Sequence, residues 1–287
     1  MLQQRIITAV VLAPLAIMAM FYLPLNTFSA VIMSVMAIGA WEWGPLMGFN
    51  NNRRRIAFVT ATIILISAIW AYLPIESLWQ DGQLNDLAII VLWLTVGWWL
   101  LSAILTFLYP RCSKFWSSHR SVRGIFGWLT LIPTWLAFVS LRSNEYQLDA
   151  YHGAQLIMFL FLMVWSADIG AYFVGKSIGK RKLMPNVSPG KTIEGFLGGV
   201  VFACMLIGVA AYILEWNQAQ IIKVLIVTCV ITTVSVLGDL NESMFKRQAG
   251  IKDSGSILPG HGGVLDRIDS LTATAPIYVL CYVYLGW

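Results

Sequence analysis

Residues 219–240 read AQIIKVLIVTCVITTVSVLGDL and carry charged side chains only at Lys223 and Asp239. A helix of about 20 apolar residues spans the hydrocarbon core of a bilayer, which is roughly 30 Å thick. This stretch is therefore long and apolar enough to cross a membrane. Similar stretches occur at residues 6–23, 28–48, 56–73, 86–108, 123–141, 154–175, 195–214 and 268–286. We therefore predict an all-α polytopic membrane protein with about nine transmembrane helices.

The composition supports this fold class. The 287 residues are 58% hydrophobic and 11% charged, whereas soluble domains are about 25% charged. We interpret the first apolar stretch as a retained helix rather than a signal peptide, because its flank lacks a convincing small-residue cleavage site. The four cysteines show no CxxC or CxxH spacing, so we interpret them as small apolar side chains rather than metal ligands or disulfides.

The basic residues predict an orientation. Cytosolic loops of membrane proteins carry an excess of Lys and Arg. If the N-terminus is cytosolic, 17 of the 19 Lys and Arg residues fall in cytosolic segments, and only Arg142 and Lys223 do not. We therefore expect a cytosolic N-terminus and an outer C-terminus, and we interpret the net charge of +5 first as a topology signal.

The densest run of charge lies in residues 238–270, GDLNESMFKRQAGIKDSGSILPGHGGVLDRIDS. On a helix, Asp239, Glu242 and Lys246 would share one face. Glycines later in the run let backbone N–H groups approach an anion closely. Aspartates suit Mg²⁺, and Lys and Arg suit phosphate oxygens. The run therefore favours a site for a metal–polyphosphate complex over an ordinary loop with ion pairs.

The candidate residues in this run fall into two groups. Asp266 and Asp269 share a helix face at i, i+3 and join Asp239 as candidate metal ligands. The candidate phosphate and substrate contacts are Lys246, Arg247, Lys252, Asp253, His261, Gly262, Gly263 and Arg267. For His261 a second interpretation stays open, as a residue that only makes hydrogen bonds within its loop.

Earlier segments add candidates on the same side of the membrane. Asp168, near the end of the stretch 154–175, faces either the bundle interior or a site. Candidate phosphate or metal contacts at the start of the following helix are Ser188, Lys191 and Thr192. Glu42 lies in the apolar run AIGAWEWGPLMGF, and the sequence leaves open whether it packs helices or contributes to a site.

Three runs, residues 243–247 (SMFKR), 252–255 (KDSG) and 258–269 (LPGHGGVLDRID), resemble the signature of the phosphatidate cytidylyltransferases, or CDP-diacylglycerol synthases. The Asp168 segment, the SPGKT segment and the chain length resemble bacterial members, so the likeness covers the whole chain. It is weakest over the first 120 residues. Gly190 departs from the pattern, because many members carry a basic residue there.

The resemblance implies an Mg²⁺-dependent enzyme that transfers the cytidylyl group of CTP to phosphatidate, giving CDP-diacylglycerol and pyrophosphate for phospholipid biosynthesis. It implies that Asp239 and Asp266 bind the metal. We expect Asp168, Asp253 and Asp269 as supporting or alternative ligands, and a second cation is left open. Carboxylates that share one Mg²⁺ should lie within roughly 6 Å, given Mg–O bonds of about 2.1 Å. We expect CTP, phosphatidate and membrane lipid as partners and no nucleic acid, and a homodimer stays open.

The chemistry and the two substrate sources predict where the site lies. The nucleophile is a phosphate oxygen of phosphatidate, already anionic near neutral pH, so we assign no Ser, His or Cys nucleophile and expect catalysis by positioning and charge neutralisation. CTP comes from the cytosol and the lipid from the bilayer. We therefore expect the site at the cytosolic ends of helices in residues 121–287, in a bacterial cytoplasmic membrane, with residues 1–120 as scaffold and lipid-facing helices.

Two other functions compete with this one. An ion-coupled transporter would also carry membrane carboxylates, but near the bilayer midplane and within inverted repeats, which we do not find. A CTP-using enzyme that acts on another lipid phosphate or a lipid alcohol is the nearer alternative. The sequence leaves the acyl-chain preference and the choice between CTP and dCTP open.

Overall fold

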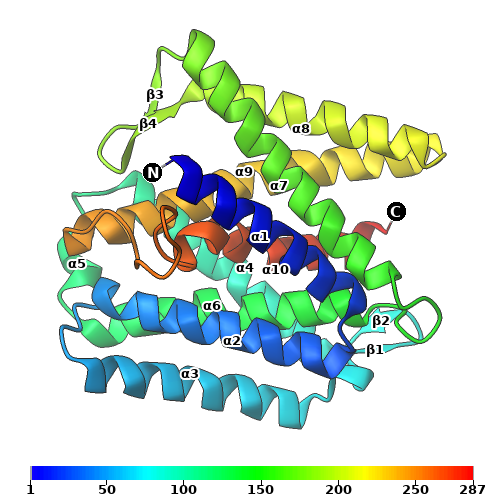
Figure 1. The fold of residues 1–287 in the computed structure, drawn as a ribbon, viewed down its shortest axis with the longest axis horizontal. Helices are drawn as coiled ribbons and strands as arrows, with labels where there is room; N and C mark the ends of the chain where they lie inside the picture. The colour runs from blue at the N-terminus through cyan, green and yellow to red at the C-terminus, as the bar shows by residue number, and fades with distance from the viewer. Residues whose placement is uncertain (1, 287) are drawn as a thin grey trace.

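The computed structural model describes residues 2–286, and most of them are helical. The long helices are α1 (Leu2–Tyr22), α2 (Leu25–Leu46), α3 (Asn52–Tyr72), α4 (Asp86–Phe107), α6 (Arg120–Ser143), α7 (His152–Ile178), α8 (Ile193–Ile213), α9 (Gln218–Ala249) and α10 (Leu265–Leu285). A short helix, α5 (Ser113–Ser117), and a single 3₁₀ turn, η1 (Ile75–Ser77), lie in connections. Successive long helices run in alternate directions, so α1 begins at one end of the bundle and α10 ends at the other (Figure 1).

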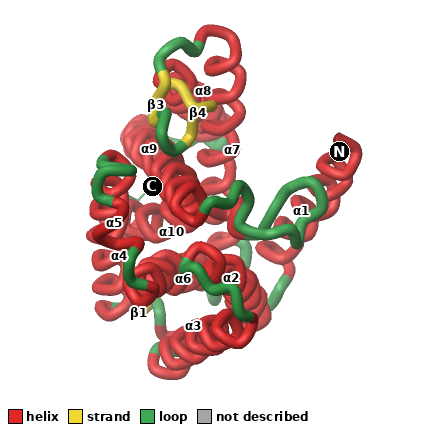
Figure 2. The backbone as a smooth tube through the Cα atoms, turned by 90° about the vertical axis from the view of Figure 1, so that its left-hand side faces the viewer, coloured by secondary structure: helices red, strands yellow, loops and turns green. Residues whose placement is uncertain are grey.

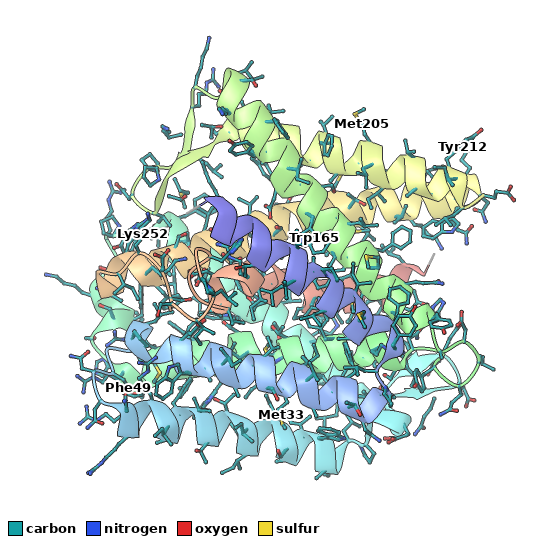
Figure 3. The ribbon with its side chains drawn as sticks, viewed as in Figure 1. Met33, Phe49, Trp165, Met205, Tyr212 and Lys252 are labelled. Atoms are coloured by element: carbon teal, nitrogen blue, oxygen red, sulfur yellow. The ribbon has the colours of Figure 1, made fainter. Side chains whose placement is uncertain are left out.

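Within residues 2–286, eight helices, α2 to α4 and α6 to α10, are long and apolar enough to cross a membrane. For α1, the apolar segment among the described residues, Val10–Tyr22, is shorter. Figure 3 shows apolar side chains such as Met205 and Tyr212 pointing outward from α8, where they are 64% and 78% exposed. Lipid rather than water suits such a surface, and the prediction of an all-α polytopic membrane protein is confirmed.

Helix α10 lies in the middle of the bundle. Seen nearly end-on, it separates a group formed by α7, α8 and α9 from a group formed by α2, α3 and α6 (Figure 2). It packs against members of both groups. Within the first group α7 and α8 approach closely, because a Cβ at Gly199 would lie 2.5 Å from the carbonyl oxygen of Ala167. Small residues permit such close helix contacts.

Helix α9 is longer than predicted. The apolar stretch ends at residue 240, and we expected Asp239 to end the span, but the helix continues to Ala249. It stops at Gly250, whose φ of 72° lies in the left-handed region that glycine adopts easily. The added turns carry Glu242 and Lys246, which are buried. These charged residues interrupt the apolar pattern of the sequence. The helix continues past them because they are buried inside the protein.

Two short hairpins were absent from the prediction. Strands β1 (Trp79–Gln80) and β2 (Gln83–Leu84) pair at one end of the bundle, and β3 (Lys182–Met184) and β4 (Ser188–Thr192) pair at the other (Figure 1). Strand β4 leads directly into α8, and the Thr192 hydroxyl caps that helix by accepting the Gly195 N–H at 3.1 Å. The predicted contacts Ser188, Lys191 and Thr192, expected at the start of the helix, therefore lie on the strand that leads into it.

The segments that hold the 17 basic residues all lie at the bundle end that carries α5 and the β3–β4 hairpin (Figure 1). The two exceptions have structural partners at the other end. Arg142 is 1% exposed and donates to the carbonyl oxygens of Ala150 and Leu23 at 2.8 and 3.3 Å. Lys223 donates to the carbonyl oxygen of Leu285 at the end of α10, at 2.8 Å. Both cations donate hydrogen bonds to backbone carbonyl groups in loops or at helix ends. These contacts explain why the two side chains lie at this end of the bundle.

Candidate active site

A cavity of about 380 Å³ opens between α7, α8, α9 and the β3–β4 hairpin. Its polar lining comprises Asp168, Tyr172, Lys176, Lys191, Thr192, Thr232 and Asp239. Much of the remaining wall is apolar, with side chains such as Leu183, Phe196, Val200 and Val236. Asp168, Tyr172 and Gly175 all line it, because residues at i, i+4 and i+7 share one face of α7. The cavity therefore combines charged groups with an apolar surface.

The charged end of the cavity contains a close ion pair. The Lys191 ammonium lies 2.5 Å from Oδ2 of Asp239, and the two side chains are 27% and 33% exposed. The Ser243 hydroxyl donates to Oδ1 of the same aspartate at 3.3 Å. Lys191 comes from β4 and Asp239 from the C-terminal third of α9, so the hairpin brings a cation to a carboxylate at the end of the apolar part of that helix.

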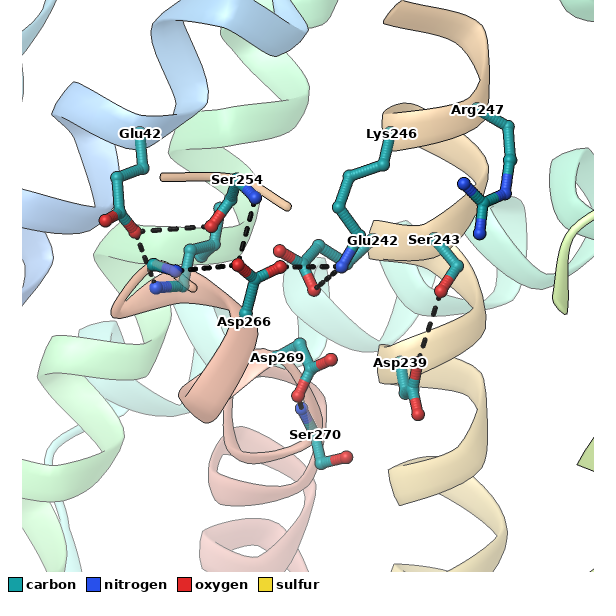
Figure 4. Close-up of polar contacts among 12 residues, drawn as sticks. Glu42, Asp239, Glu242, Ser243, Lys246, Arg247, Ser254, Asp266, Asp269 and Ser270 are labelled. Carbon is teal, nitrogen blue, oxygen red and sulfur yellow. Dashed lines mark hydrogen bonds and ion pairs between the residues drawn. The ribbon is translucent and has the colours of Figure 1, made fainter. Parts of the chain in front are cut away.

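A second charged group lies deeper, between α9 and α10 (Figure 4). The Lys246 ammonium donates to Oε2 of Glu242 at 3.0 Å and to Oδ1 of Asp266 at 2.7 Å. The other oxygen of Asp266 accepts the backbone N–H groups of Ser254 at 2.9 Å and Gly263 at 2.8 Å. Buried charges need such partners because an unpaired ion loses its hydration without compensation. We call Lys246, Glu242 and Asp266 the buried charge network.

Helix α9 connects the two groups. Asp239 and Lys246 stand seven residues apart and so lie on one helix face, as predicted. Asp239 lines the cavity, whereas Lys246 belongs to the buried charge network. Asp269, one turn after Asp266 on α10, accepts the N–H of Ser270 at 2.7 Å. The predicted metal ligands thus lie at the same end of the α9–α10 pair, although Asp239 and Asp266 have different hydrogen-bond partners.

The remaining predicted contacts surround these groups. Arg247 is exposed, and its Nε donates to the carbonyl oxygen of Val187, which ties the hairpin to α9. Ser188 lies on β4. Lys252, seen in Figure 3, is exposed, as are Asp253 and Arg267. The structure therefore gathers these side chains at one end of the bundle without fixing their contacts to a ligand.

The glycine-rich segment forms a closed loop before α10. The N–H of Leu258 donates to the carbonyl oxygen of Gly262 at 2.9 Å, and the His261 N–H donates to Leu258 at 2.9 Å. Gly262 has a φ of 86°, a conformation that favours glycine. His261 is partly buried, and within the described chain its Nδ1 has no hydrogen-bond partner. That nitrogen keeps the substrate-contact interpretation of His261 open.

Two further residues organise this loop, Glu42, whose role the sequence left open, and Ser254, which the sequence interpretation missed. Glu42 accepts hydrogen bonds from Val264 and Leu265, more than 200 residues away in the chain. Its signal in the sequence was an acidic side chain inside an apolar run. Ser254 gave no separate signal, because serines are common in glycine-rich loops.

The carboxylates are chemically suited to Mg²⁺. In the described chain no three or more His, Cys, Asp or Glu side chains form a ready metal cluster, but Mg²⁺ usually takes only one or two protein carboxylates, with water and phosphate oxygens as its other ligands. A carboxylate offers about four acceptor positions. Asp239 has two donors and Asp266 has three, so each retains capacity for a further ligand.

Comparison with known proteins identifies the family. A model described as the cytidylyltransferase family matches residues 3–285. The chain belongs to this family. It is 38% identical to a phosphatidate cytidylyltransferase of Haemophilus influenzae, over 99% of this chain and 100% of that protein. It is 41% identical to one of Pseudomonas aeruginosa, over 100% of this chain and 99% of that protein. The family match therefore includes every helix from α1 to α10.

Proposed function

We propose that the chain transfers the cytidylyl group of CTP to phosphatidate, giving CDP-diacylglycerol and pyrophosphate in phospholipid biosynthesis. The observation that carries this proposal is the cavity, where Asp168, Lys191 and Asp239 stand beside apolar side chains of α8 and α9. A lipid phosphate needs both kinds of surface. The full-length relatives named phosphatidate cytidylyltransferase support the same substrate pair.

The charged residues address the main obstacle to this reaction, which is repulsion between two anionic substrates. Lys191 is balanced by Asp239 in the ion pair at 2.5 Å. A substrate phosphate oxygen can accept a hydrogen bond from the Lys191 ammonium in place of Asp239. The Asp239 carboxylate is then available to a cation. Charge-assisted contacts of this kind are the stronger class of hydrogen bond. Lys191 therefore serves as a phosphate contact, and Arg267 and Arg247 supply further positive charge at the same end.

We assign Asp239 and Asp266 as the residues that hold Mg²⁺, with Asp168 and Asp269 as nearby carboxylates. Both Asp239 and Asp266 can accept further ligands, which supports the assignment. That they bind the same Mg²⁺ ion remains a prediction. Bound Mg²⁺ would neutralise phosphate charge and favour the departure of pyrophosphate. Lys246 holds Asp266 at 2.7 Å and keeps that carboxylate in place.

The transfer needs no covalent enzyme intermediate. A phosphate oxygen of phosphatidate attacks the α-phosphorus of CTP, the new P–O bond forms, and the bond from the α-phosphorus to the bridging oxygen breaks to release pyrophosphate. Because the attacking oxygen is already anionic, the protein does not have to remove a proton from it. The chain's residues position the two phosphates and balance their charge.

The site should face the cytosol of a bacterial cell. The segments that hold 17 of the 19 basic residues lie at the same end of the bundle as its charged groups (Figure 1), and basic loops are typical of the cytosolic side. This orientation also gives the site access to CTP. Residues 121–287 supply the cavity and the buried charge network, so we keep the division into a catalytic part and the largely scaffolding residues 1–120.

An assay on purified protein in detergent tests the proposal. CTP and Mg²⁺ are supplied with phosphatidate, with a different lipid phosphate, or with diacylglycerol, and pyrophosphate and CDP-lipid are both measured. We expect equal amounts of pyrophosphate and CDP-diacylglycerol with phosphatidate and much less product with the other lipids. Efficient use of another lipid phosphate or of the alcohol, with none of phosphatidate, would assign a different reaction to the same cavity.

A further inference from the structure

Glu42 is a buried carboxylate outside the cavity and outside the buried charge network. It lies on α2 and is 1% exposed. Among the described residues, no Lys, Arg or His side chain forms an ion pair with it. A buried carboxylate is costly unless hydrogen bonds replace its hydration. The donors that it uses therefore indicate its role.

Those donors belong to the start of α10. Oε2 of Glu42 accepts the Leu265 N–H at 2.7 Å, and Oε1 accepts the Val264 N–H at 3.1 Å. The first N–H groups of a helix have no partner within the helix, and its N-terminus carries partial positive charge. The residue at the cap position, Val264, supplies no side-chain hydrogen bond. Glu42 thus caps α10 from another helix.

The loop before α10 fits closely around this carboxylate. A Cβ at Gly255 would overlap Glu42, and its three nearest neighbours would all be atoms of that side chain. A Cβ at Gly263 would lie 2.6 Å from Oε2 of Glu42 and would also meet the Ser254 hydroxyl. Neither glycine has a positive φ. These two positions therefore require glycine because a larger side chain would overlap Glu42, and not because of their backbone conformation.

The same loop residues also hold Asp266. Ser254 donates its hydroxyl to Glu42 at 3.4 Å and its N–H to Asp266 at 2.9 Å. Gly263, which packs against Glu42, donates its N–H to Asp266 at 2.8 Å. Figure 4 shows Glu42, Ser254 and Asp266 joined in this way, with Lys246 on the far side of Asp266. Two carboxylates from α2 and α10 therefore hold one loop from opposite sides.

We propose that Glu42 is a positioning residue for the cytidylyl transfer, which sets the start of α10 and thereby the place of the Asp266 carboxylate. The inference rests on the proposed function for its kinetic consequence, but the capping contact itself does not depend on that function. Misplacing a catalytic group by about 1 Å can cost about 10²-fold in rate. Glu42→Gln should therefore lower kcat by about 10- to 100-fold.

Kinetics separate positioning from substrate binding. Because Glu42 lies outside the cavity, we expect KM for CTP and for phosphatidate to change by less than about threefold. Loss of an interaction made only in the transition state lowers kcat instead. The matched control is Glu215→Gln, an exposed acid at the other end of the bundle, which should behave as wild type. A Glu42→Gln protein that is folded and has wild-type kcat would overturn the proposal.

A double-mutant cycle tests the same contact without relying on one variant. Gly255→Ala should lower kcat because its Cβ displaces the Glu42 side chain. In a Glu42→Ala background the space is empty, so adding Gly255→Ala should change kcat by less than about twofold, as expected for coupled neighbours. Effects that multiply instead would overturn the proposal, and this cycle decides the matter if Glu42→Gln is too unstable to purify.

Amide hydrogen exchange gives a readout that does not need activity. Exchange at Val264 and Leu265 should be faster in Glu42→Gln than in wild type, with no change in α8. Unchanged protection at both amides would refute the capping role. If wild-type protein shows the protection but makes no CDP-diacylglycerol, the proposed function fails while the capping contact stands.

Discussion

Replacing Lys246 by methionine should reveal how much the buried charge network contributes to stability and, separately, to catalysis. The Lys246 side chain is 11% exposed, and its partners Glu242 and Asp266 are 4% and 5% exposed. Removing one partner of a buried ion pair costs about 3–5 kcal/mol, because the charge left behind has no compensation. We therefore expect Lys246→Met to lose about 3–5 kcal/mol of unfolding free energy, measured by denaturation in detergent.

The two carboxylates should not suffer equally from this substitution. Asp266 keeps the N–H groups of Ser254 and Gly263, whereas Glu242 loses its cation and keeps the Asp269 carboxylate beside it. Adding Glu242→Gln removes the less compensated charge. The double variant should therefore recover about 1–3 kcal/mol of coupling energy.

Activity should not return with stability in the double variant, because Asp266 would still lack its cation. The matched control is Lys182→Met, an exposed lysine on β3, which should change unfolding free energy by less than about 0.5 kcal/mol. Two results would refute the reasoning. One is a Lys246→Met protein as stable as wild type, and the other is a Glu242→Gln change that destabilises Lys246→Met further.

Three other predictions follow from the site and its orientation. Cysteine substitutions at Gln83 and Gln147 should react with an impermeant reagent outside intact cells, whereas substitutions at Arg54 and Lys182 should not; external labelling at Lys182 would reverse the orientation. Direct transfer predicts inversion at the α-phosphorus of CTP and no labelled protein from α-labelled CTP, so net retention would contradict it. Lys191→Ala should lower kcat/KM about 10- to 100-fold, since a hydrogen bond to a charged group contributes about 1.5–3 kcal/mol. Lys182→Ala is the control, and equal kcat/KM values for the two variants would show that Lys191 does not contact a phosphate.

Helix positions were predictable because the bilayer imposes a simple length and polarity requirement. The one large difference was the end of α9. An apolar pattern records only residues that face lipid or an apolar core, and Glu242 and Lys246 are buried by pairing with each other and with Asp266. Such pairing depends on α10, which follows in the chain, so it could not be inferred from the α9 sequence by itself.

The candidate site was predictable in its residue types but not in its division into two groups. Spacing along α9 placed Asp239 and Lys246 on one face, as observed. The β3–β4 hairpin, which brings Lys191 to Asp239 at 2.5 Å, consists of strands of 3 and 5 residues and has no strong pattern. A short hairpin of this kind is set by tertiary contacts such as Arg247 to Val187.

The glycine loop was interpreted in the sequence as an anion-binding segment. In the structure its Gly263 N–H binds Asp266, and the Val264 N–H that follows binds Glu42. The chain's own carboxylates thus occupy the N–H of Gly263, which the sequence assigned to substrate, and that of its neighbour Val264. No local pattern could show this, because Glu42 is 222 residues from Val264.

The activity of Asp239→Asn tests the central claim most directly, because Asp239 joins the cavity, the Lys191 ion pair and the proposed Mg²⁺ site. The variant should be folded in detergent but should form no CDP-diacylglycerol from CTP and phosphatidate at any Mg²⁺ concentration. The control is Asp86→Asn, an exposed acid at the start of α4, which should keep wild-type activity. If Asp239→Asn instead turns over at a near-normal rate with unchanged Mg²⁺ dependence, the assignment of the active site to this cavity is wrong.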